Sequence, residues 1–326
     1  MILFIAGEFC YYLLIAQTGI VEVFHSELPS FFTLPLGGIL GSLLVYKPLG
    51  ILKDDASKIR FFLALQLVCS LFYPSLNLFV LGLLGVSLGM SAPLLIKLCS
   101  KHLGNMAFAL GITYAASTAL FTYAPLLRGS LAVVLSVIAL VSSFFLSYTP
   151  KRDVEESKPL GLYAIVAMAS WAFLDANLFE TLSRSADMSI WRSSLWPVIL
   201  CFHLVGMATA YYFRARMKEH SYLILVLFTL SYTLYATKEA LLLSIAYPFV
   251  ISYYNFTIIE RLSRITSLRT LGIVMLFTGW IAGGGGLMCS LTHTTYLGVL
   301  LIGLMLCIET YQLIYQTSFE RIKNVL

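Results

Sequence analysis

The stretch that decides the fold is KPLGILKDDASKIR, which runs from Lys47 to Arg60. Four cations and the adjacent carboxylates Asp54 and Asp55 stand here between two long apolar segments. Charged side chains at this density must face water, because ionisable groups are costly inside a bilayer. The excess of Lys and Arg in a short loop predicts that this water is cytoplasmic.

Composition indicates the class of protein. Hydrophobic residues make up 59% of the 326 residues and charged residues 11%, against roughly 45–50% and about 25% in soluble domains. A helix needs about 20 mostly apolar residues to cross a bilayer, and this chain is apolar over most of its length. The sequence therefore predicts an all-α integral membrane protein. The net charge of +5 lies in loops, so nucleic acid is not indicated as a partner.

The six cysteines stand singly in apolar segments, and no CxxC or comparable spacing occurs. This pattern indicates neither a disulfide framework nor a structural zinc site. We expect the cysteines to act as small packing residues, and we expect no cofactor.

Twelve hydrophobic segments are predicted to span the membrane. All but four of the 21 Lys and Arg residues fall in segments that are cytoplasmic in this topology, as the positive-inside rule requires. The four exceptions are Arg128, Arg184, Arg192 and Lys238, which we expect at the outer edges. Both termini are then cytoplasmic, in a multi-pass protein of a bacterial inner membrane. The predicted spans are 2–24, 31–46, 61–72, 76–98, 106–127, 131–148, 160–179, 195–213, 222–237, 240–259, 271–291 and 296–316.

The longest predicted cytoplasmic connection is 149–159, which is charged and bracketed by prolines. It separates six predicted spans in 1–148 from six in 160–326. Six helices, a linker and six more helices is the layout of two parallel repeats related by an axis along the membrane normal. We therefore expect two six-helix bundles.

The chain resembles a transporter of the major facilitator superfamily. That family carries the pattern Gly-x-Leu-x-Asp-x-x-Gly-Arg-Lys between its second and third helices, and Gly50, Leu52 and Asp54 match it here, with Lys58 in the Arg position. Ser57 replaces the second glycine. The resemblance covers the whole chain in topology and this loop in motif. It implies alternating access, and it implies that Asp54 helps to latch the two halves on the cytoplasmic side. The alternative to the latch is that Asp54 is only a solvated loop charge.

Glu8 is the first candidate for a functional group within the membrane. On a helix it shares a face with Tyr11 and Tyr12 at spacings of three and four, and Gln17 lies further along. The resemblance implies that the first, fourth, seventh and tenth helices surround the transport cavity, so this face is expected to line it. The other interpretation places Glu8 among the inner headgroups.

Asp175 is the leading candidate for proton coupling. At 1.5 Å per residue it lies far along the seventh predicted helix, on a face shared with Trp171. Desolvation there favours the neutral carboxyl, so the group could take up and release a proton. The alternative is a fixed hydrogen bond to a partner such as Asn177 or Gln17.

The tenth and eleventh predicted spans suggest a cavity wall and a flexible contact. Tyr247 is the deep tyrosine of a polar and aromatic set around Pro248 in the tenth span. The eleventh contains a glycine run at 283–286, a composition that permits both close helix contact and bending. Glu309, in the last span, has no partner that the sequence identifies.

His203 and Met207 lie one helical turn apart and are suitable copper ligands. An HxxxM in the eighth helix resembles the copper-importing branch of the same superfamily. That branch also has a methionine pair in the seventh helix, where this chain has only Met168.

The sequence thus predicts a secondary transporter that moves a small solute, with protons as the coupling ion in symport. It is expected to act as a monomer in the lipid bilayer and not as an enzyme, since it shows neither a nucleophile–base set nor a metal cluster. No buried basic residue is predicted that could bind an anion, since the four cations outside the cytoplasmic segments are all expected at outer edges. This favours a neutral or cationic solute. The alternatives are the copper importer and a transport-inactive scaffold or assembly factor.

Overall fold

The computed structural model describes residues 1–24, 28–48, 50, 52, 54–146, 160–185, 188–192, 194–214 and 220–325. Within these residues the chain forms helices and no strand. The predicted linker 149–159 lies outside them.

The first half contains six helical segments. The first is continuous from Ile2 to Phe24 and changes from α1 (Ile2–Tyr11) to the π-helical η1 (Tyr12–Ile20) and then to α2 (Val21–Phe24). The others are α3 (Leu28–Leu44), α4 (Asp55–Ser70), α5 (Leu78–Cys99), α6 (Leu103–Leu120) and α7 (Gly129–Phe144), with a 3-10 turn, η2 (Pro125–Leu127), before α7.

The second half begins with α8 (Leu162–Arg184), a 3-10 turn, η3 (Ile190–Arg192), and α9 (Trp196–Phe213). Then follow α10 (His220–Ala236) and α11 (Ala240–Ser263). A further continuous helix consists of α12 (Leu268–Met275), the π-helical η4 (Leu276–Ile281) and α13 (Ala282–Leu291), and α14 (Tyr296–Val325) ends the chain.

Seven of the described helices are long and apolar enough to cross a membrane, and four more are apolar but shorter. The all-helical membrane class is therefore confirmed, while the count of twelve spans stays a prediction. The predicted third span, 61–72, overlaps α4 and runs two residues beyond its end, and the first turns of α4 also hold Asp55, Lys58 and Arg60.

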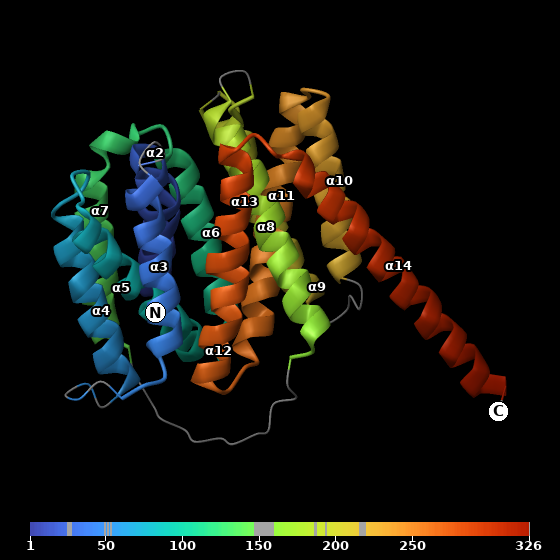
Figure 1. Ribbon diagram of the computed structural model, residues 1–326, viewed down its shortest axis with the longest axis horizontal. Coiled ribbons are helices and arrows are strands. Elements are labelled where there is room, and N and C mark those ends of the chain that lie inside the picture. The colour runs from blue at the N-terminus through green and yellow to red at the C-terminus, as the bar shows by residue number, and fades with distance from the viewer. Residues whose placement is uncertain are drawn as a thin grey trace.

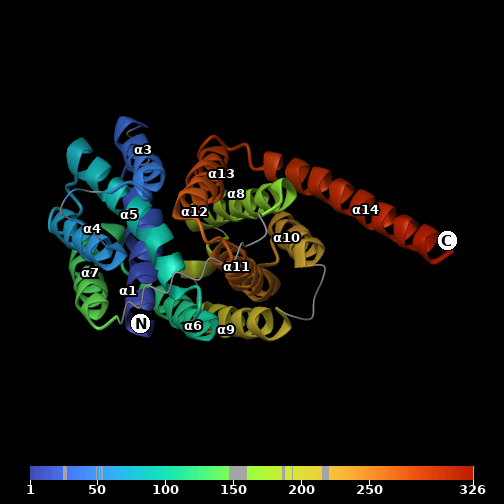
Figure 2. The same ribbon diagram turned by 90° about the horizontal axis from the view of Figure 1, so that it is seen from below.

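The helices run side by side in two groups, and α14 leans away from the second group toward its C-terminal end (Figures 1 and 2). Within the groups the most extensive contacts join α3 with α5, α9 with α11 and α8 with α13. Between the groups, α6 packs on α9 and α3 packs on α12 and η4. The second helix of each group thus contacts the fifth helix of the other group. These two contacts lie on either side of a central space between the groups.

The Lys47–Arg60 stretch lies at one end of the bundle, which we call the basic end. Asp54 is the N-cap of α4: its Oδ1 accepts a hydrogen bond from the Ser57 backbone N–H at 2.7 Å, and the Ser57 hydroxyl donates to Oδ2 at 2.8 Å. Ser57 therefore takes part in a helix cap and not in the glycine turn of the family pattern. Gly50 has φ +37°, a left-handed conformation that favours glycine.

The other matching residues of this motif also have local partners. Lys58 is buried, and its Nζ donates to the carbonyl of Lys47 at 3.0 Å, just beyond the end of α3. Asp55 pairs with Lys97 at the end of α5 at 3.0 Å. These bonds all lie within the first group of helices, so the latch between the two halves stays a prediction.

Small residues allow close helix contact, as predicted for the glycine run, but only at part of it. A Cβ added to Gly286 would lie 2.2 Å from the Phe173 carbonyl oxygen on α8, whereas one added to Gly284 would meet nothing within 4 Å. A second close glycine contact, not anticipated from the sequence, joins α3 to α5. There a Cβ on Gly85 would lie 2.2 Å from the Leu34 carbonyl oxygen.

Arg128 was expected at an exposed outer edge, and that expectation is wrong. The side chain is 1% exposed, and its guanidinium group donates to the Leu14 carbonyl at 2.8 Å and to the Thr18 hydroxyl at 2.7 Å within η1. It also donates to the carbonyls of Phe121 and Tyr123. Fixed backbone acceptors explain how a cation can be buried at this depth.

The Asp54 cap makes a testable prediction. Asp54→Ala should lower the free energy of unfolding by about 1 kcal/mol. Asp54→Asn should keep most of the stability that the cap provides, because Asn caps helices nearly as well as Asp. Thermal denaturation of the purified variants measures both. Equal losses in the two variants would show that the charge, not the cap, matters.

The same cap should depend on pH. The hydrogen bonds from Ser57 hold the pKa of Asp54 below its ordinary value. A carboxyl group whose pKa is lower in the folded protein than in the unfolded chain stabilises the fold at any pH above its unfolded pKa of about 3.9. This contribution is lost as the pH falls through the pKa of the folded protein. The stability difference between wild type and Asp54→Ala should therefore shrink only below about pH 4.

The glycine run makes a second prediction with an internal control. Gly286→Ala should destabilise the protein by roughly 1–3 kcal/mol, because the added methyl group would overlap the α8 backbone. Gly284→Ala, two residues earlier, should be neutral or slightly stabilising, since Ala is the better helix former. Melting temperatures of the two variants in one detergent give the comparison, and equal effects would refute the close contact.

Candidate functional site

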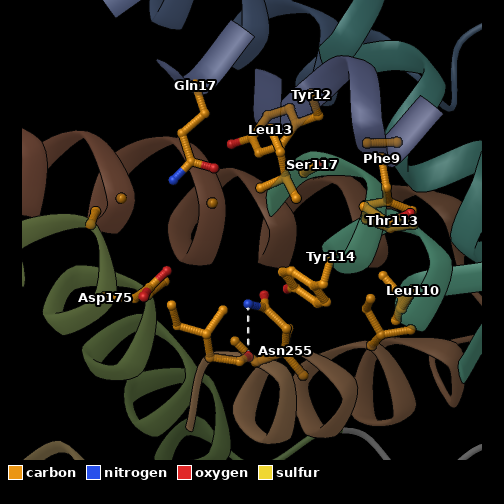
Figure 3. A pocket seen from close by; sticks show the side chains of 18 of the residues that line it. Phe9, Tyr12, Leu13, Gln17, Leu110, Thr113, Tyr114, Ser117, Asp175 and Asn255 are labelled. Carbon is orange, nitrogen blue, oxygen red and sulfur yellow. Dashed lines mark hydrogen bonds between the residues drawn. The ribbon is translucent and has the colours of Figure 1, made fainter. Parts of the chain in front are cut away.

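A cavity of about 270 Å³ lies between the two groups of helices. Its walls come from α1 and η1, α5, α6, α8, α9, α11 and η4. Two carboxyl groups, Glu8 and Asp175, and one imidazole, His203, belong to its lining, whereas no Lys or Arg is among the described residues that line it. Figure 3 shows Asp175, Gln17, Tyr114 and Asn255 around this space.

Asp175 is a buried polar group of the cavity that is held by hydrogen bonds. It lies on α8 and is 7% exposed. The Tyr247 hydroxyl donates to Oδ1 at 2.8 Å and the Tyr254 hydroxyl donates to Oδ2 at 2.5 Å. Both tyrosines come from α11, and their spacing of seven residues is two helical turns, which places them on the same face.

The surroundings of Asp175 leave its charge unpaired. Among the described residues, no Lys or Arg lies within ion-pair distance of it, so the only stabilisation of the ionised form comes from two neutral phenols. Hydrogen bonds lower the cost of burying a charge but do not cancel it. This carboxyl group can therefore be neutral when the cavity is dry and ionised when water or a cation reaches it.

The partners of Asp175 differ from those expected. Asn177 is buried and its Oδ1 accepts a hydrogen bond from Tyr232 at 3.1 Å, so it serves the packing of α8 on α10. Gln17 lines the cavity with Asp175, but the pair makes no hydrogen bond in the described structure. Tyr247 lies behind the carboxylate and not in the cavity lining, and Trp171 is fully buried outside it.

Glu8 lines the cavity from α1, and its side chain is buried. Oε2 accepts a hydrogen bond from Gln66 Nε2 on α4 at 3.0 Å, and Oε1 accepts one from the Ser91 hydroxyl on α5 at 3.1 Å. The carboxyl group is thus oriented by two neutral donors, in the same manner as Asp175.

The face predicted for the first helix is only partly correct. Glu8, Tyr12 and Gln17 line the cavity, at spacings of four and five residues. Tyr11 points elsewhere: it is buried, and its hydroxyl lies 2.9 Å from the Ser70 hydroxyl on α4. Tyr11 is the last residue of α1 and lies three residues after Glu8, about 60° round the helix from it. This position sets the phenol against α4 and not in the cavity.

His203 lies in the cavity wall, but its ring is already engaged. Nδ1 lies 2.8 Å from the Ser252 hydroxyl on α11, and the ring stacks on Tyr114 with a centroid distance of 4.6 Å. Met207 is buried and outside the lining. Among the described residues no group of three or more His, Cys, Asp or Glu could hold a metal ion, and the copper site stays a prediction.

Three residues of the site were not singled out from the sequence. Sequence patterns did not single out Tyr254, although its spacing of seven residues from Tyr247 was a usable signal. Tyr114 and Trp191 had none, because their contacts join segments far apart in the chain. Trp191 comes from the connection between α8 and α9, where sequence patterns predict only a loop.

The sequence matches no family model and no curated protein sequence. The structure is similar to the crystal structure of a bacterial homologue of the iron transporter ferroportin in the outward-facing state. The two share 15% sequence identity, the match covers 97% of each chain, and the TM-score is 0.56. That neighbour is a transporter with the major facilitator fold, not an enzyme. The chain therefore has the fold of a major facilitator superfamily transporter.

Proposed function

We propose that this chain is a secondary transporter that moves a small cationic or neutral solute by alternating access, with Asp175 as the proton-coupling group. The observation that carries the proposal is the buried Asp175 carboxyl group, which lines a cavity between two packed groups of helices and has only phenol donors. We further propose twelve spans, divided into 1–148 and 160–326 by a cytoplasmic linker, in a monomer of a bacterial inner membrane.

The lining of the cavity supports a cation over an anion. Two carboxyl groups and no Lys or Arg belong to its described lining, and Arg128 is fully engaged by backbone carbonyls and Thr18. An anion would meet unbalanced negative charge there, and like charges in a low-dielectric space repel strongly. A cation would gain from the same arrangement.

Proton coupling follows from the position of Asp175 between two environments. A buried, unpaired carboxyl group favours the neutral form, whereas access of water from one side restores ionisation. If the two ends of the cavity open in turn, the group takes its proton from one side and releases it to the other. The two phenols hold the carboxyl group in place throughout.

A metal cation is the specific candidate within this class. The structural neighbour is a homologue of an iron transporter, and Glu8, Asp175 and His203 face one cavity here. A hydrated divalent ion needs few direct protein ligands, so the absence of a three-ligand cluster in the described residues does not oppose transport. The copper alternative would require His203 to leave Ser252 and Tyr114.

Uptake by proteoliposomes tests the proposal. The protein is reconstituted and given an imposed pH gradient with labelled Fe²⁺, Mn²⁺ and Cu⁺, and with tetraethylammonium as an organic cation. Asp175→Asn keeps the shape and a hydrogen-bond acceptor but cannot ionise. It should lose gradient-driven accumulation of the transported ion while it retains exchange of that ion across the membrane. Unchanged accumulation would remove Asp175 from the mechanism and make Glu8 the leading candidate.

Tyr254→Phe tests the phenol separately. A hydrogen bond to a charged group contributes about 1.5–3 kcal/mol, so its loss should lower coupled accumulation about tenfold or more. Tyr232→Phe is the matched control, because its hydroxyl binds the Leu174 carbonyl and Asn177 away from the cavity. Initial rates of uptake for both variants give the answer, and equal effects would assign the loss to packing.

A further inference from the structure

Trp191 occupies an unusual place for a residue in a connecting segment. Such segments normally run over the surface, yet this side chain is 3% exposed and belongs to the cavity lining. Its neighbour in η3, Ile190, is buried as well. By contrast Trp196, at the start of α9 in the same connection, is 41% exposed. The η3 segment thus turns inward from the end of the bundle opposite the basic end (Figure 1).

The indole of Trp191 joins aromatic rings from both groups of helices. Its centroid lies 5.3 Å from Phe179 on α8 and 6.2 Å from Phe121, which follows α6. Phe121 and Phe179 also meet each other edge to face at 6.3 Å. We call these three residues the aromatic layer. Since all three line the cavity, the layer forms its wall toward the end opposite the basic end.

The aromatic layer lies directly over the polar site. Trp191 stacks on His203 at 5.8 Å and lies 6.2 Å from Tyr247, the residue that donates to Asp175. A solute that leaves Asp175 toward this end of the bundle therefore meets the indole first. Phe121 is fixed from behind, because Arg128 lies over its ring at 5.2 Å and donates to its carbonyl.

One atom of the layer is unsatisfied. The Trp191 Nε1–H is buried and has no hydrogen-bond partner among the described residues. A buried donor without an acceptor raises the energy of the packed position, whereas burial of the large aromatic surface lowers it. Displacement of the indole into water would reverse both terms. The unsatisfied N–H and the buried ring therefore have opposite effects on the stability of the packed position.

We infer that Trp191 is the gate residue of the transport path, and that its indole must leave the aromatic layer before a solute can pass between the cavity and the side opposite the basic end. The inference rests on the proposed function only in taking the cavity as the path. Its test measures access to the cavity without any substrate, so that failure of the gate and failure of transport are distinguishable.

The experiment places a single cysteine at Ser117 in a chain without native cysteines. Ser117 lines the cavity one turn before Phe121 (Figure 3). A membrane-impermeant thiol reagent is added from the side that also labels an exposed control, Thr292→Cys. With Trp191 present, Ser117→Cys should react slowly; with Trp191→Ala, its rate should rise about tenfold. Trp191→Phe should keep most of the seal, since an aromatic ring remains.

Two further variants make the outcome decisive. Trp196→Ala removes an exposed tryptophan of the same connection and should leave the rate unchanged. Phe121→Ala removes the partner ring from the other group of helices and should raise the rate as Trp191→Ala does, so a folding defect in one variant leaves the other as the test. The Thr292→Cys rate and the melting temperature report the fold. If neither Trp191→Ala nor Phe121→Ala raises the Ser117→Cys rate, the gate is refuted. The gate is also refuted if Trp191→Phe and Trp196→Ala raise this rate as much as Trp191→Ala does.

Discussion

The structure depends on how carboxyl groups are held within an apolar helical bundle. Asp175 accepts hydrogen bonds from two phenols of one facing helix, and Glu8 accepts them from an amide and a hydroxyl of two others. Each set requires three-dimensional register between helices, because a shift of one turn would leave a buried charge without donors. The packing of α8 on α11 and of α1 on α4 and α5 is thereby fixed around the cavity.

The first helix reaches this arrangement by a change of helical type. In the π-helical η1 the side-chain spacing widens, so that Gln17 and Thr18 join Glu8 at the cavity. Arg128 binds the Leu14 carbonyl and the Thr18 hydroxyl of the same stretch. A buried guanidinium group is tolerated there because the altered helix presents acceptors to it. Backbone carbonyls and the Thr18 hydroxyl thus offset part of the cost of burying this cation.

The two ends of the bundle are built differently. At the basic end the charged motif residues make local bonds: Asp54 caps its own helix and Lys58 binds a carbonyl beyond α3. At the other end the two groups of helices meet through aromatic rings from α8, η3 and the end of α6. Local polar bonds can survive a relative movement of the two groups, whereas the aromatic contacts between the groups cannot.

The sequence by itself determined the helical membrane class of this protein, because apolar length is a property of short segments. The resemblance of the motif at Gly50, Leu52, Asp54 and Lys58 indicated the fold family. It also identified Asp175 and Glu8, since a carboxyl group inside an apolar run is visible without coordinates. The span count, the domain boundary and the roles of these residues are still predictions.

Only the tertiary structure decided which partners these groups have. Tyr11 was expected in the cavity wall, but its hydroxyl partner, Ser70, lies 59 residues away on α4. The burial of Arg128 was missed because two of its acceptors, Leu14 and Thr18, lie more than a hundred residues away. Tyr254 and Trp191 joined the site for the same reason. Hydrogen bonds and ring contacts between distant segments depend on helix register and packing, which local sequence patterns do not encode.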